Sequence, residues 1–380
     1  MKTTVNAART FQIALMLLVF LSAVAFSLHS CGGPYQQEEV YWTGTPAGGS
    51  NSSTNGGSNS SSGSITTLAS GLRSPSSIAL YGDYVYWSDY YDNRILRVKK
   101  TGGDVETIVS SNISYPLNIC IEGDYVYIAE ANPLLPNQTV NSLKRIGAAG
   151  TGNPVTLYSS QYYIGGLAVD ANNIYWTEHR DTAGTLKQAV KTGNGTVIDL
   201  VYDLKRPGAV AVHKSNVYYV VEGSSTDGII SSGDGAIRKI AAGGGSVVIL
   251  ATNLNYPCSL SVSSTNVFFC EAGSFTGSTT IGSIRKSTLT QASNLPVLTG
   301  LNRVTDIYYD STNYCVYFSE SDGTSNATGY LKRVRSDGNN PTILADSQSD
   351  PGEMITDGTY VYWVQANWNG NEGKIMRTGK

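Results

Sequence analysis

The stretch that decides the fold is YVYWSD at residues 84–89, an aromatic and β-branched segment that ends in a carboxylate. Residues of these types favour a pleated strand over a helix. The pattern returns six times, at residues 125–130, 173–178, 217–222, 267–271, 316–320 and 361–365. The copies follow one another at roughly 41 to 50 residues, the period of one four-stranded propeller blade.

Each copy has the same neighbours in the chain. A strand precedes it (residues 77–80 in the first unit), and the turn Gly82-Asp83 joins the two as a hairpin. A third strand with apolar and then basic residues follows (95–97), and a Gly-rich turn leads to a fourth (107–109). The last unit stops after its third strand, at residues 374–377, whereas residues 65–70 carry a fourth-strand pattern ahead of the first unit. We therefore expect an all-β, seven-bladed β-propeller of four-stranded blades, with the ring closed by residues 65–70 completing the last blade.

The repeated Tyr-Trp-[Ser/Thr]-[Asp/Glu] pattern, clearest around Trp87 and Trp176, resembles the YWTD repeat of lipoprotein-receptor propellers. Those propellers have six blades, so bacterial seven-bladed propellers of the NHL and lyase type are the closer likeness. The resemblance covers residues 65–380. It implies a fold and not a function, because propellers perform many unrelated tasks.

The N-terminal 30 residues read as an export signal, with Lys2 and Arg9 ahead of an apolar run at residues 11–26. Leu28-His29-Ser30-Cys31 resembles a bacterial lipobox, which implies cleavage before Cys31 and lipidation of its thiol. Gly32 follows the cysteine, and by resemblance to Gram-negative lipoproteins this implies sorting to the outer membrane. The alternative is ordinary signal cleavage that leaves a free thiol. Residues 31–64 are rich in Gly, Ser and Asn and are expected to form a flexible tether.

The charge balance argues against a nucleic-acid partner. The net charge is −3, the pI is about 5.7, and the chain has no basic stripe to neutralise phosphates. The lipid on Cys31 would be the sole contact with a membrane. No cofactor motif is present, so no cofactor is expected.

Topology predicts where a ligand would bind. Turns between first and second and between third and fourth strands share one face and are short, whereas the second-to-third loops and the inter-blade links share the other and are longer. Function usually lies in long loops on a rigid scaffold, and aromatic rings beside Asn and Asp suit a sugar or a peptide. The alternative is that these rings cap the blade ends. The candidate ligand-binding residues on this loop-rich face are Tyr90, Tyr91, Tyr115, Tyr162, Tyr163, His179, Tyr256, Phe275 and Trp368.

The second strands end in a near-ring of carboxylates. Either the acids hold a cation, or they pair with basic residues of the third strands. Pairing is the preferred interpretation, because second strands are too far apart to share one ion. The acids are Asp89, Glu130, Glu178, Glu222, Glu271 and Glu320, and the expected partners include Arg97, Arg145, Lys239 and Arg333.

The small number of histidines limits the kinds of catalytic site that the chain can form. Beyond the signal the chain has only His179 and His213, expected on opposite faces, so no catalytic residue and no metal site is predicted. A streptogramin-type lyase would want paired His and Glu at the channel mouth. Cys258 and Cys270 lie on the first and second strands of one unit, where they form either a disulfide or two small buried residues.

Together these observations predict an envelope-anchored lipoprotein whose propeller binds a protein partner or a glycan. The alternatives are a scaffold in envelope assembly and a metal-dependent enzyme of the lyase or lactonase type.

Overall fold

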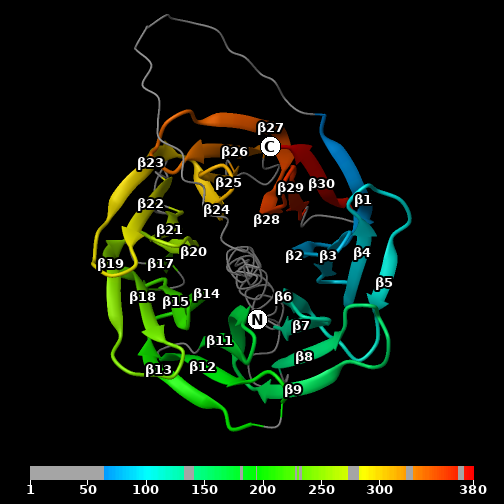
Figure 1. Ribbon diagram of the computed structural model, residues 1–380, viewed down its shortest axis with the longest axis horizontal. Coiled ribbons are helices and arrows are strands. Elements are labelled where there is room, and N and C mark those ends of the chain that lie inside the picture. The colour runs from blue at the N-terminus through cyan, green and yellow to red at the C-terminus, as the bar shows by residue number, and fades with distance from the viewer. Residues whose placement is uncertain are drawn as a thin grey trace, which may run out of the picture.

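Seven four-stranded antiparallel sheets, arranged as blades around a central axis, form the described part of the computed structural model (Figure 1). The structure describes residues 64–131, 141–179, 183–193, 195–226, 229–230, 233–272, 282–321, 328–366 and 372–380. The predicted signal peptide, Cys31 and all of the predicted tether except residue 64 lie outside these ranges. Within them, no helix has the length and hydropathy of a membrane span.

Each blade runs from an inner first strand to an outer fourth strand. Blade 1 contains β2 (Pro75–Tyr81), β3 (Tyr84–Asp89), β4 (Arg94–Lys99) and β5 (Glu106–Val109). Blade 2 contains β6 (Pro116–Glu122), β7 (Tyr125–Glu130), β8 (Asn141–Gly147) and β9 (Val155–Ser160). Blade 3 contains β10 (Tyr163–Val169), β11 (Asn173–His179), β12 (Gly184–Val190) and β13 (Ile198–Leu204). Blade 4 contains β14 (Pro207–His213), β15 (Asn216–Val221), β18 (Gly235–Ala241) and β19 (Val248–Leu254). A small hairpin, β16 (Ser225–Thr226) with β17 (Ile229–Ile230), interrupts this blade between its second and third strands.

The remaining blades repeat the plan. Blade 5 contains β20 (Pro257–Val262), β21 (Asn266–Glu271), β22 (Gly282–Thr288) and β23 (Leu295–Leu301). Blade 6 contains β24 (Arg303–Asp310), β25 (Cys315–Ser321), β26 (Thr328–Arg335) and β27 (Thr342–Ser349). Blade 7 contains β28 (Pro351–Thr356), β29 (Tyr360–Gln365), β30 (Gly373–Gly379) and β1 (Thr66–Leu72). The prediction of an all-β, seven-bladed propeller with four strands per blade is confirmed.

Burial explains why the second strand carries the repeat. Successive side chains of a strand point to opposite faces, and the second strands lie between neighbouring blades, so both of their faces are buried. In β3, Val85, Tyr86 and Trp87 are all within 1% of complete burial. Large rings at Trp176 and Trp363 fill the corresponding places in β11 and β29. The repeat is therefore the packing signature of the spaces between blades.

Blade 7 is assembled from both ends of the described chain. β1 pairs antiparallel with β30, with Thr66 opposite Arg377 and Leu72 opposite Gly373. The inner strand β2 of blade 1 contacts β28 of blade 7, so the circle of first strands is continuous (Figure 1).

On the loop-rich face, a glycine at the start of a third strand packs against the residue that opens the next blade. A Cβ on Gly373 would lie 2.4 Å from Cδ of Pro75, and one on Gly184 would lie 2.3 Å from Cδ of Pro207. Gly235 and Gly329 meet Pro257 and Pro351 in the same way. Only glycine lets the two blades approach this closely.

On the opposite face, which carries the short turns, a basic residue of the third strand reaches the next blade. Nη1 of Arg145 donates to the backbone oxygen of Lys191 at 3.1 Å, and Nζ of Lys286 donates to that of Ser336 at 2.7 Å. Arg377 makes the same bond to the backbone oxygen of Lys100. The accepting residue is in each case the one that follows the third strand, so these bonds join blades 2 to 3, 5 to 6 and 7 to 1.

Candidate functional site

The loop-rich face holds the residues predicted to bind a ligand, and most of its second-to-third loops lie outside the described residues. Phe275 and Trp368 are among the residues not described. The others are placed, and the structure brings several of them together near blades 1 to 3.

Tyr90, Tyr91, Tyr115 and Tyr163 form one cluster with Leu117 and Ala131. The ring centroid of Tyr90 lies 5.1 Å from that of Tyr91 and 5.4 Å from that of Tyr115. The Tyr90 hydroxyl donates to the backbone oxygen of Ala131 at 3.0 Å. Its ring is only 1% exposed and therefore packs blade 1 against blade 2, while the other three rings are half-buried.

Of the other predicted residues, His179 lies beside this cluster and Tyr256 lies in the core between two other blades. His179 ends β11 and lies edge-on to Tyr163, with ring centroids 6.4 Å apart. Tyr162 is half-buried beside it in the chain. Tyr256 is 3% exposed and belongs to the core between blades 5 and 6. His213 ends β14 at a short turn, on the face opposite His179.

The carboxylates that end the second strands are paired, as expected, but with other partners than those named from the sequence. Asp89 contacts Nη2 of Arg94 at 2.5 Å, and Glu130 contacts Nζ of Lys144 at 2.9 Å. The other pairs are Glu178 with Lys187, Glu222 with Arg206, Glu271 with Arg285, and Glu320 with Lys332. Neighbouring residues of a strand point to opposite faces, so when Lys144 meets the acid, Arg145 points away from it. The prediction that Arg97, Arg145, Lys239 and Arg333 pair with these acids is therefore wrong, and Glu222 pairs with a residue ahead of the first strand β14 instead of a third-strand residue.

Within the described residues no group of three His, Cys, Asp or Glu side chains is arranged to hold a metal ion. Cys258 and Cys270 are both free and buried, so the bond considered between them is not formed in this structure. The two cysteines lie on neighbouring strands beside a bulge between Pro257 and Leu260, and the Cys258 sulfur is 3.9 Å from the backbone oxygen of Cys270. The Cys258 thiol also faces the backbone oxygen of Val304 at 3.4 Å.

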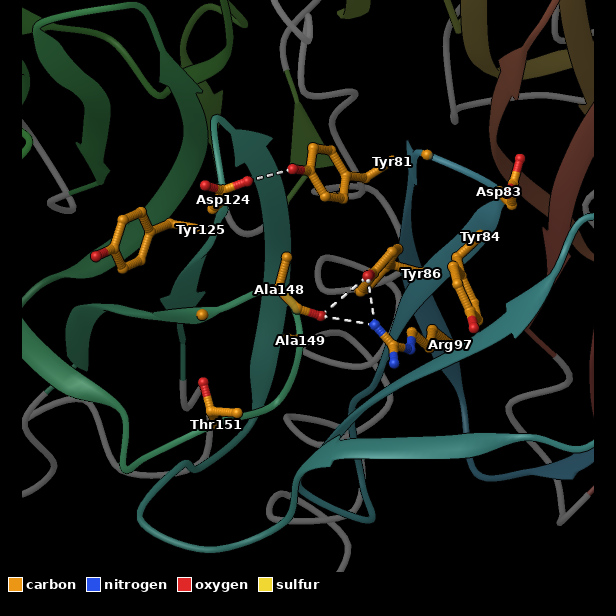
Figure 2. Close-up of a pocket in the computed structure, with 12 residues that line it drawn as sticks. Tyr81, Asp83, Tyr84, Tyr86, Arg97, Asp124, Tyr125, Ala148, Ala149 and Thr151 are labelled. Carbon is orange, nitrogen blue, oxygen red and sulfur yellow. Dashed lines mark hydrogen bonds between the residues drawn. The ribbon is translucent and has the colours of Figure 1, made fainter.

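A hollow of about 530 Å³ opens on the short-turn face, at the seam between blades 1 and 2 (Figure 2). It lies on the opposite side of the ring from the predicted ligand-binding loops. Its walls are the turn between β2 and β3, the turn between β6 and β7, and the turn that follows β8. The lining residues with functional side chains are Tyr81, Asp83, Tyr84, Tyr86, Arg97, Asp124, Tyr125 and Thr151, and the small lining residues are Gly82, Gly147, Ala148 and Ala149.

The acid–lysine pair that bridges three other seams is absent at this one. In blade 2 the residue opposite Tyr125 is Glu122, which lies 3.8 Å from Nζ of Lys191 in blade 3. In blade 7 the corresponding Asp357 lies 3.9 Å from Nζ of Lys100 in blade 1. At the seam between blades 1 and 2, Tyr81 replaces the acid and Ala148 replaces the lysine. The long lysine side chain is absent there, and space remains between the blades.

Arg97 forms one wall and is held by several partners. Its guanidinium lies 4.2 Å from the ring centroid of Tyr84 and donates from Nη2 to Glu106 at 2.7 Å. Nη1 donates to the Tyr86 hydroxyl and to the backbone oxygen of Ala148, each at 3.0 Å. Arg145 and Arg377 make the same bond to the next blade, so Arg97 is held in place across the seam.

Tyr81 and Asp124 bridge the upper edge of the hollow (Figure 2). The Tyr81 hydroxyl donates to Oδ1 of Asp124 at 2.5 Å, and this bond raises the pKa of Tyr81 above its ordinary value. Tyr81 and Tyr125 are 37% and 42% exposed, and the ring of Tyr125 points away from Tyr81 and lies against Arg145. Sequence reasoning missed these residues, because each is an ordinary member of its strand until the seams are compared.

No family model and no curated protein sequence matches the chain. Solved structures do. A streptogramin B lyase aligns over 83% of this chain and 98% of its own with 14% identity and a TM-score of 0.61. A virginiamycin B lyase from Staphylococcus aureus aligns over 82% and 98% with 13% identity and a TM-score of 0.60. An oligogalacturonate lyase in complex with manganese aligns over 85% and 94% with 9% identity and a TM-score of 0.61. At these identities the likeness concerns the fold alone.

Proposed function

We propose that the chain is an envelope lipoprotein, lipidated on Cys31, whose propeller is a binding module. The observation that carries the proposal is the hollow between blades 1 and 2, a concave site with aromatic walls and a few convergent polar groups. It occurs at a seam without the acid–lysine pair that bridges three other seams, and the bond from Arg97 to Ala148 crosses it. Binding needs such a preformed surface and no reactive group.

Binding is supported over catalysis by the chemistry of the described residues. His179 and His213 lie on opposite faces, and the carboxylates that end the second strands are engaged in ion pairs. A general acid or base must lie within hydrogen-bond reach of a reacting group and of its orienting partner. Two surfaces of the described residues support a binding role, the hollow and the tyrosine cluster of the loop-rich face.

A photo-crosslinking experiment on the full chain tests the binding function. A photoreactive phenylalanine analogue replaces Tyr81 in one variant and Tyr91 in another, so that each reports on one face. We expect a specific adduct from intact cells for at least one variant. Irradiation that yields no adduct at either position would reject a binding role for both surfaces.

The anchor is tested separately with Cys31→Ser. If Cys31 is lipidated, the wild-type chain incorporates a labelled fatty acid and the variant does not. Absence of label in the wild-type chain, or equal label in both, would contradict the lipoprotein assignment and leave the binding function standing.

A further inference from the structure

We propose that the hollow between blades 1 and 2 is a binding site for a neutral saccharide. This inference rests on the proposed binding function and names the ligand class for that one site. Three kinds of observation carry it: the aromatic walls, the placement of the carboxylates, and the way in which the nearby cations are already engaged.

The aromatic walls suit a sugar ring. Tyr81, Tyr84 and Tyr86 of blade 1 line the hollow, and Tyr81 is 37% exposed at its opening. A pyranose presents flat C–H faces that pack against aromatic rings, and its hydroxyls project around its edge. The small residues Gly147, Ala148 and Ala149 of blade 2 lie across the hollow from Tyr86 and leave room for such a ring.

The polar groups at the rim are hydrogen-bond acceptors. Asp83 and Asp124 both line the hollow and are exposed to solvent. Carboxylates accept short, strong bonds from hydroxyl groups, and one carboxylate can bind two adjacent hydroxyls. The Tyr81 hydroxyl holds Oδ1 of Asp124 in place, so the acceptor is positioned before a ligand arrives.

The cations beside the hollow argue against charged ligands. Arg97 lies over the ring of Tyr84, so this ring face already carries a cation. A second cation would be repelled by the guanidinium group. An anion meets Asp83 and Asp124 at the rim, and Glu106 neutralises Arg97 at 2.7 Å. A neutral ligand that donates hydrogen bonds is the class that remains.

Two other seams show which side chain can fill this place between blades. Lys100 and Lys191 are half-buried at the seams that precede blades 1 and 3, where each faces the acid of its neighbour. Ala148 has the equivalent place in blade 2, and its neighbour is Tyr81. The substitution Ala148→Lys therefore restores a side chain that the fold accommodates elsewhere, and this side chain would fill the hollow.

The test is a glycan array, printed with neutral, anionic and cationic oligosaccharides and probed with the full chain in detergent. Isothermal titration of the best neutral glycan follows, with four proteins: wild type, Tyr81→Ala, Ala148→Lys and Tyr202→Ala. Tyr202 is 70% exposed on the outer strand β13 and away from the hollow, so its variant is the matched control. Thermal unfolding of each variant confirms that it is folded.

We expect a neutral glycan to bind, with affinity reduced roughly tenfold or more by Tyr81→Ala and by Ala148→Lys and unchanged by Tyr202→Ala. The inference is overturned if no neutral glycan binds, if charged glycans bind better, or if folded Ala148→Lys binds as well as wild type. The crosslinking experiment separates these results from a failure of the binding function, because adducts at either face would persist when the saccharide assignment is wrong.

Discussion

Arg377 donates a hydrogen bond to the backbone oxygen of Lys100, although 277 residues separate the two along the chain. The bond joins the last blade to the first. Its counterparts, from Arg97 to Ala148 and from Arg145 to Lys191, join consecutive blades. One side-chain device is therefore used both between consecutive blades and at the closure of the ring.

We expect Arg377→Ala to lower the free energy of unfolding by about 1.5–3 kcal/mol, because it removes a charged donor and leaves a carbonyl without its partner. Urea denaturation of the variant and the wild type measures the loss. Arg335→Ala is the control, since Arg335 is half exposed and pairs with Asp337 at the surface, where such pairs contribute about 0–1 kcal/mol. Equal losses in both variants would contradict a role for Arg377 in closure.

Gly373 and Gly379 begin and end the same strand, β30, and they should respond differently to alanine. A Cβ at position 373 would clash with Pro75, whereas one at position 379 meets no atom within 4 Å. We expect Gly373→Ala to lower the unfolding free energy by about 1–3 kcal/mol and Gly379→Ala to be neutral or slightly stabilising. Thermal melts compare the two. An unchanged melting temperature for Gly373→Ala would mean that the blades can separate at little cost.

Asp306 predicts a pH dependence of stability. Its carboxyl is buried between blades 5 and 7, where Oγ of Ser259 donates to it at 2.7 Å and the backbone N of Met354 donates at 3.0 Å. Burial raises its pKa from 3.8 to about 7. Between about pH 4 and pH 7 the folded state holds a proton that the unfolded state has lost, so stability falls as pH rises through this window and levels off above it.

The slope expected from this one group is at most about 1.4 kcal/mol per pH unit. Asp306→Asn removes the titration, so denaturation curves at pH 5, 6, 7 and 8 should be flatter for the variant than for the wild type. Identical pH profiles for the two proteins would show that Asp306 ionises normally in the fold.

Cys258 and Cys270 should resist alkylation in the native protein. Both are buried, and burial raises the pKa of the Cys258 thiol well above its ordinary value, which keeps it in the unreactive protonated form. Iodoacetamide labelling followed by mass spectrometry should find both cysteines unlabelled in the native state and labelled in urea. Absence of labelling in urea without a reductant would reveal a disulfide and contradict the free thiols.

The sequence predicted the architecture because the architecture repeats. The buried second strand returns at a regular spacing, so the same packing requirement is repeated seven times along the chain. Partner choice was harder to predict. The basic residues of the third strands look alike in sequence, yet Lys144 meets Glu130 while Arg145 points to the next blade, since strand alternation sends them to opposite faces.

The hollow between blades 1 and 2 was beyond sequence reasoning for a different reason. It exists because a small residue, Ala148, stands where lysines stand at two other seams. Ala148 is therefore informative only when it is compared with Lys100 and Lys191. That comparison needs the register of every blade, which loops of unequal length obscure in the chain. The tyrosine cluster around Tyr90 was easier to find, because large rings at loop positions are conspicuous in any sequence.

The pairing of β1 with β30 also sets when blade 7 can be completed during synthesis of the chain. Thr67 and Met376 are 309 residues apart, and at roughly 5–20 residues per second a ribosome needs about 15 to 60 s to travel from one to the other. During that interval β1 has no partner strand to form hydrogen bonds with. A chain that stops before Gly373 lacks β30, so β1 has no strand to pair with and its backbone groups stay open to other strands.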